Sequence, residues 1–188
     1  FASLGIPQIA LSVFDPIQAA LSGDATVKAA AVTLEAKAVQ IANVLTVAQA
    51  AFQGADIPAA QAQSAVLQSL ASTIAKGNAD LTNTDTLKTV LQQAVTTVAP
   101  PNLQTALLST VTDCGKVIAA NNAIAQQAAT GFAAGTVTDP AAALADCFRV
   151  ATLVQTDIAP KVQAITPGGD LASIISQYTG DNLTNNLG

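Results

Sequence analysis

The side chains best suited to chemistry in this sequence are two cysteines, Cys114 and Cys147. A zinc site needs three or four Cys, His or carboxylate ligands at close spacing, and the chain has no histidine. A catalytic cysteine usually needs a histidine base, and no CxxC redox motif is present. We therefore predict that the two cysteines form one intrachain disulfide, with two free buried thiols as the alternative.

The positions of the two cysteines place a geometric condition on that disulfide. The cysteines fall on two consecutive predicted helices, 101–129 and 140–159. At 1.5 Å per residue, Cys114 lies about 22 Å from the end of its helix and Cys147 about 10 Å from the start of the next. The Cα atoms of a disulfide lie within about 7 Å. The bond therefore requires the connecting loop to fold back, or the first helix to break near Gly115.

The carboxylates indicate helix capping more than catalysis. Glu35 is the only glutamate, and most aspartates fall at predicted helix starts or turns, where they accept hydrogen bonds from free backbone N–H groups. Asp113 and Asp146 stand beside the cysteines. They could form a local acidic pair, but we favour two solvated side chains.

Motifs for catalysis or for cation binding are weak or absent. The sequence has no G-x-S-x-G, P-loop or dinucleotide-binding motif. Residues 78–85 offer Asn78, Asp80, Asn83 and Asp85 to calcium, but they lack the glycine and the bidentate glutamate of an EF-hand. A capped loop is the better interpretation. We expect a protein that is not an enzyme, with no metal and no cofactor.

The composition excludes several classes of partner. Only 10% of residues are charged, the net charge is −5, and Arg149 is the single arginine. Nucleic acids and anionic membrane surfaces require clustered cations, which are absent. We also expect no transmembrane segment, because the long uncharged stretch 89–112 contains glutamines, an asparagine and two prolines.

The elements that position these residues are predicted to be helices. Prolines follow caps at Asp15-Pro16 and Asp139-Pro140, and apolar residues recur at helical spacing along 26–52. We predict one domain over 1–180 and a polar tail over 181–188. The fold class is all-α, an Ala-rich bundle of about five to seven helices with one intrachain disulfide. The expected helices are 16–23, 26–52, 58–77, 86–99, 101–129, 140–159 and 171–178.

The expected compartment follows from the disulfide. Disulfides persist in oxidising spaces such as the cell exterior. No leader is visible in the sequence, which is consistent with a leader that has been removed. The predicted surface is rich in Thr, Gln and Asn and poor in charge. Asn182-Leu183-Thr184 is an N-glycosylation sequon, so Asn182 is a candidate acceptor. We expect a secreted or cell-surface protein.

Two functions agree with these features. A mean hydropathy of +0.45 favours a bundle that binds an apolar, lipid-like ligand or a hydrophobic surface, with helix 26–52 at its centre. The alternative is a self-assembling subunit of an extracellular filament, coat or matrix, favoured by low charge. The candidate lining residues of an apolar site are Leu34, Ile41, Leu45 and Phe52, with Leu67, Leu70, Leu107 and Leu108 as candidate neighbours. The alternative is that these residues fill a tight core, and we favour it because Ala-rich seams pack closely and leave little room for a ligand pocket.

Overall fold

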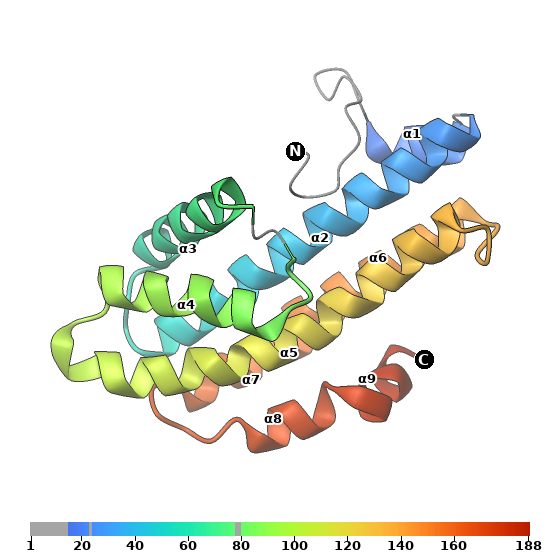
Figure 1. Ribbon diagram of the computed structural model, residues 1–188. Coiled ribbons are helices and arrows are strands. Elements are labelled where there is room, and N and C mark those ends of the chain that lie inside the picture. The colour runs from blue at the N-terminus through green and yellow to red at the C-terminus, as the bar shows by residue number, and fades with distance from the viewer. Residues whose placement is uncertain (1–14, 23, 78–79) are drawn as a thin grey trace.

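The computed structural model describes residues 15–22, 24–77 and 80–188, and over these residues it contains helices and no strand (Figure 1). The all-α prediction is therefore confirmed. In chain order the elements are α1 (Pro16–Ser22), α2 (Ala25–Gly54), α3 (Ala59–Ala75), α4 (Thr84–Val98), α5 (Pro101–Ala133), α6 (Pro140–Leu153), the π-helical segment η3 (Val154–Ile158), α7 (Ala159–Ile165), α8 (Ala172–Gln177) and α9 (Gly180–Leu187).

The helix starts follow the capping residues of the sequence. The Asp15 carboxylate accepts a hydrogen bond from the backbone N–H of Ile17 at 3.0 Å. Asp24 caps α2 and Asp139 caps α6 through similar bonds of 2.9 Å. Each bond satisfies a backbone donor that the first helical turn leaves without a partner. Local capping chemistry therefore sets where these helices begin.

Two long helices form the centre of the bundle. Figure 1 shows α2 and α5 side by side, with α3 and α4 over one end and α8 and α9 along the outer side of α5. α2 also contacts α1, α6 and α7, which agrees with the central place predicted for helix 26–52. By length and composition, α2 is the one helix of the described chain that could cross a membrane, but half of its most apolar window is buried inside the bundle.

The apolar core consists of two clusters. The main cluster extends from Val44 along the second half of α2 and includes α3, α4, the first part of α5, and α7 and α8. The end cluster joins α1, the first half of α2, the last part of α5 and the start of α6, and alanine is its commonest residue. Small side chains let these helix axes approach closely and fill the interior.

A buried polar layer lies between the two clusters. The Lys37 ammonium donates to the side-chain oxygens of Gln40 at 3.0 Å and Gln126 at 2.7 Å. The Asn43 amide donates to the Asn122 side chain at 3.0 Å, which in turn donates to the backbone carbonyl of Leu81 at 2.9 Å. These bonds join α2, α5 and the loop before α4, so they fix the register of the central helix pair.

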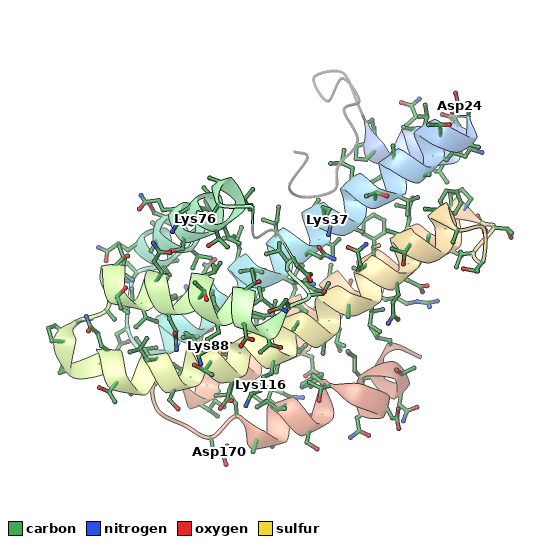
Figure 2. All side chains as sticks on the ribbon, viewed as in Figure 1. Asp24, Lys37, Lys76, Lys88, Lys116 and Asp170 are labelled. Atoms are coloured by element: carbon green, nitrogen blue, oxygen red, sulfur yellow. The ribbon has the colours of Figure 1, made fainter. Side chains whose placement is uncertain are left out.

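Lys37 differs from the other lysines that Figure 2 labels. Burial lowers the pKa of its ammonium, an effect that the charge of Asp80 partly offsets. Figure 2 shows Lys37 on the central helix α2, whereas Lys76 and Lys116 are exposed to solvent. The helical spacing of Lys37, Gln40 and Asn43 is the one sign of this layer in the sequence.

The predicted disulfide between Cys114 and Cys147 is wrong, because both cysteines are free and buried. Helix α5 continues unbroken through Gly115 to Ala133, so neither condition for the bond is met. The Cys147 thiol lies 3.9 Å from the carbonyl of Ala125, eleven residues beyond Cys114 and thus about 16 Å farther along the helix. Cys114 belongs to the main cluster and Cys147 to the end cluster.

The C-terminal part of the chain also differs from the sequence-based prediction. From the sequence, Pro160 is expected to kink or end the helix that begins at Pro140, and in the structure it does not end it. The chain instead passes through η3, in which the N–H of Ala159 donates to the carbonyl of Val154, and continues to Ile165. Proline has no N–H to offer the preceding turn, and a π-helical turn accommodates that loss. The polar tail is also helical as α9, with Leu183 buried.

Candidate functional site

An open, mostly apolar groove lies between α6–η3 and α9, with a volume of about 530 Å³. We call it the α6–α9 groove. Ligand sites are typically concave, mostly apolar and of about 300–1,000 Å³. The residues of one wall recur every three or four positions along α6–η3, so they lie on one face of that helix. The lining residues are Ala145, Phe148, Arg149, Thr152, Leu153 and Thr156, with Asn186 and Leu187 from α9.

Phe148 is the feature that distinguishes this groove. Its side chain is 39% exposed, and it belongs to neither core cluster. A second hollow of about 510 Å³, between the start of α2 and the end of α5, contains Phe132 and Val137, but both of these pack against the end cluster. Among the described residues, Phe148 is therefore the aromatic ring most open to a ligand, and covering it would remove apolar surface from water.

Arg149 places a positive charge at the edge of the groove. One nitrogen of its guanidinium lies 3.2 Å from a carboxylate oxygen of Asp146, and both side chains are about half exposed. No acidic residue lines the groove. An exposed pair of this kind contributes about 0–1 kcal/mol, so Asp146 holds the guanidinium only weakly.

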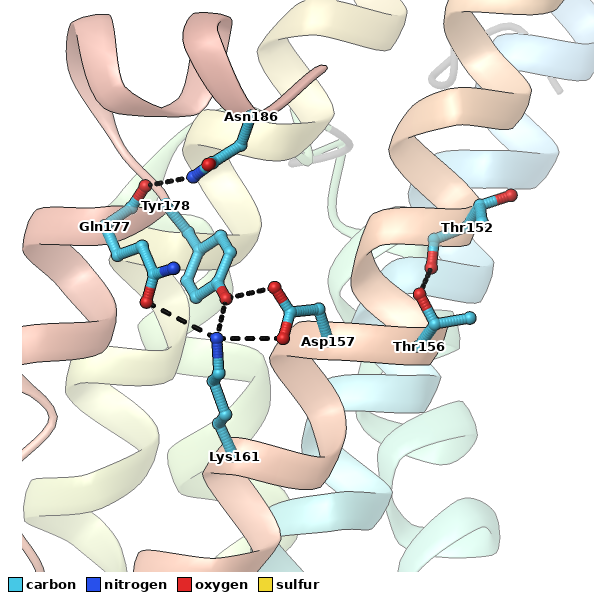
Figure 3. Close-up of polar contacts among 7 residues, drawn as sticks. All are labelled: Thr152, Thr156, Asp157, Lys161, Gln177, Tyr178 and Asn186. Atoms are coloured by element: carbon cyan, nitrogen blue, oxygen red, sulfur yellow. Dashed lines mark hydrogen bonds and ion pairs between the residues drawn. The ribbon is translucent and has the colours of Figure 1, made fainter. Parts of the chain in front are cut away.

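The second wall of the groove depends on how α8 and α9 are attached. Figure 3 shows that the Tyr178 hydroxyl donates to Asp157 and accepts a hydrogen bond from Lys161. Lys161 also lies 2.8 Å from Asp157, and the Asn186 amide donates to the backbone carbonyl of Gln177 at 2.9 Å. This cluster ties the end of α8 to η3 and so places α9 beside α6.

The protonation states of that cluster favour a structural role. Burial, together with the Asp157 carboxylate, raises the pKa of Tyr178. Hydrogen bonds from Lys161 and Tyr178 lower the pKa of Asp157, while hydrogen bonds to Asp157 and Tyr178 raise the pKa of Lys161. At neutral pH the cluster is thus a neutral phenol between a fixed ion pair. A general base would need a pKa near the working pH.

The lining residues predicted from the sequence contribute mainly to the core. Phe52, Leu70 and Leu107 are buried in the main cluster. Ile41, Leu45 and Leu108 pack against it while partly buried, Leu34 is partly buried, and Leu67 is exposed. None of the eight lines the α6–α9 groove, the second hollow, or two further surface hollows, one between α3 and α4 and one between α2 and α7. Ligand contact by these residues stays a prediction.

The acidic candidates have local partners. Asp113 forms an ion pair with Lys116 at 2.7 Å, one helical turn away, as Asp146 does with Arg149. Asp80 accepts hydrogen bonds from Thr82, and the Asn83 side chain caps α4, while Asn78 lies outside the described residues. No group of three or more potential metal ligands occurs in the described part of the chain.

Sequence reasoning missed the α6–α9 groove because two distant segments form it. The only local signal was an aromatic residue and the single arginine side by side at Phe148 and Arg149, on a helix whose other face is apolar. Comparison of the chain with protein-family models, curated proteins and solved structures found no match.

Proposed function

We propose that this protein is a non-catalytic binding protein that holds an apolar, lipid-like ligand in the α6–α9 groove. The observation that carries the proposal is the exposed ring of Phe148 in a concave surface that also contains Leu153 and Leu187. Full burial of a phenylalanine side chain is worth about 1.5–3 kcal/mol. A ligand that covers the groove would gain part of that free energy, together with the contribution of the two leucines.

The non-catalytic part of the proposal is supported by the composition. The chain has no histidine and one glutamate, so few groups can act as acid or base near neutral pH. The lining residues of the groove include one ionisable group, Arg149, and a guanidinium does not deprotonate in proteins. Binding therefore explains the groove better than a reaction does.

A secreted or cell-surface location belongs to the same proposal, with less support than the sequence suggested. The free cysteines remove the disulfide from the argument. Low charge and a surface rich in Thr, Gln and Asn still favour an extracellular protein. The sequon residue Asn182 is exposed, but its side-chain amide donates to the carbonyl of Ser176 at 2.9 Å. A glycan on that amide would have to break or adapt this bond.

The alternative is self-assembly, and one surface feature favours it. Ile17 and Leu21 are 45% and 53% exposed, and they lie one turn apart on α1, where they form an apolar ridge. Sedimentation velocity over a hundredfold range of concentration tests this alternative. Growth into regular oligomers that Leu21→Ser abolishes would favour it over the ligand-binding proposal.

The ligand-binding proposal is tested by titrating the protein with a fluorescent fatty-acid probe. Phe148→Ser should weaken probe binding at least tenfold, because it removes the largest apolar side chain from the groove. Leu67→Ser is the matched control, since Leu67 is also exposed, at 44%, but lies on α3 outside the groove. Equal affinity of the wild type and Phe148→Ser, or a loss caused by Leu67→Ser alone, would contradict the proposed site.

A further inference from the structure

We propose that the α6–α9 groove selects long-chain carboxylates, and that Arg149 binds the carboxylate head group. This inference rests on the proposed function and names its ligand class. The fatty chain lies against Phe148, Leu153 and Leu187. The carboxylate head group either replaces Asp146 as the partner of the guanidinium or binds the guanidinium together with Asp146. Arg149 is then a specificity-determining residue.

The distribution of charge carries the first part of the argument. The chain has twelve acidic residues and one arginine, and that arginine lines the apolar α6–α9 groove. Two of the lysines, Lys116 and Lys161, are paired with aspartates outside the groove. In a protein of net charge −5, a groove whose only ionisable lining residue is a cation is complementary to an apolar molecule with one negative end.

The geometry of Arg149 carries the second part. A guanidinium has five N–H donors in a planar fork that matches a carboxylate. In the described structure one nitrogen of Arg149 bonds to Asp146, at 3.2 Å, and the Arg149 side chain is 57% exposed. The remaining donors are open to a ligand, and the loosely held Asp146 is a weak competitor. A single cation suits one carboxylate, whereas an anionic membrane surface needs several.

The helical spacing places the contacts for the head group and for the chain of such a ligand close together. Arg149 and Leu153 are four residues apart, and Phe148 and Thr152 share the same face, so head-group and chain contacts lie within two turns. Leu187 of α9 faces this wall across the groove. A ligand with its carboxylate at Arg149 therefore keeps its chain over the apolar part of the groove.

The test compares three ligands with the same twelve-carbon chain and different head groups. Isothermal titration below the micelle concentration gives the affinities of dodecanoate, dodecanol and dodecyltrimethylammonium. We expect the wild type to bind dodecanoate about fivefold more tightly than dodecanol, since an exposed charged contact is worth up to about 1 kcal/mol. The cation should bind most weakly.

Three variants then identify the residue responsible. Arg149→Gln should bind dodecanol as the wild type does but lose the preference for dodecanoate. Asp146→Asn should increase that preference, because it removes the competing carboxylate. Lys116→Gln is the matched control: it removes the other cation of an i,i+3 pair, outside the groove, and should keep the preference unchanged.

The outcomes separate this inference from the function on which it rests. If none of the three ligands binds, the proposed function fails and the inference fails with it. If all three bind the wild type with equal affinity, or if Arg149→Gln keeps the preference, the groove binds apolar chains but Arg149 does not select carboxylates. Circular dichroism of each variant shows whether it is folded, which is expected for changes at exposed positions.

Discussion

The buried amide of Asn122 gives the sharpest prediction about stability. Its side chain donates to the carbonyl of Leu81 at 2.9 Å and accepts from the Asn43 amide at 3.0 Å. Asn122 and Asn43 are essentially inaccessible to water, with exposed fractions of 0% and 1%. Asn122→Ala deprives both groups of this partner inside the bundle, where water cannot readily replace it.

The expected cost follows from those two groups. A buried polar group that loses its partner costs about 1–3 kcal/mol, so Asn122→Ala should lower the free energy of unfolding by about 4 kcal/mol. That is a large part of the roughly 5–15 kcal/mol of a typical domain. In a chain of this size it corresponds to a melting temperature about 10 °C lower.

Urea unfolding followed by circular dichroism measures the effect, with linear extrapolation to water. Asn102→Ala is the matched control, because Asn102 is an exposed asparagine on the same helix, α5, and it should change stability by less than about 0.5 kcal/mol. The double variant Asn43→Ala with Asn122→Ala should cost less than the two single changes together. An Asn122→Ala protein as stable as the wild type would refute the claim that the polar layer holds α2 against α5.

The remaining predictions concern two glycines and the two thiols. Gly54→Ala should destabilise by about 1–3 kcal/mol, because its new Cβ would lie 2.4 Å from the carbonyl oxygen of Gln163. Gly115→Ala should instead stabilise by up to about 1 kcal/mol in urea unfolding through helix propensity, since its nearest neighbour would be 3.6 Å away; the opposite order of the two variants would contradict these contacts. Without reductant, Cys114 and Cys147 should both be alkylated in denaturant, because they form no disulfide. Neither should be alkylated in the folded protein at pH 8, because burial raises the pKa of each thiol to about 12. Intact mass measures both results. Below about pH 9 both the folded and the unfolded state keep the thiols protonated, and the contribution of the thiols to stability is fully present. As the pH rises from 9 to 12 the unfolded state ionises first, so the free energy of unfolding falls by up to about 1.4 kcal/mol per pH unit for each thiol. A urea midpoint that does not fall over this range would contradict the raised pKa of the thiols.

Local chemistry explains which parts of the fold the sequence could predict. The caps at Asp15, Asp24 and Asp139 act within a few residues, so the helix starts could be predicted to within about two residues. The course of α5 depended on packing. Gly115 has room for a side chain, but α5 continues through it as one helix, and the break that the disulfide needed is absent there.

The candidate site was less accessible to sequence reasoning. The apolar residues on α2 were correctly assigned to a central helix, but the sequence could not show whether they line a cavity or fill a core. The α6–α9 groove exists because Tyr178 binds to Asp157 and Lys161 and so brings α9 beside α6. These partners are distant in the sequence, and α9 is polar, so no periodic apolar pattern indicated that α9 contacts the bundle.

Ligand binding in the α6–α9 groove is tested most directly by a methyl NMR titration of the protein with dodecanoate. If dodecanoate binds in the groove, the methyl signals of Leu153 and Leu187 shift with a common saturation curve, while those of Ile41, Leu45 and Leu107 stay unchanged. Shifts confined to the second group would place the ligand among the core helices. The absence of any shift at saturating dodecanoate would contradict ligand binding altogether.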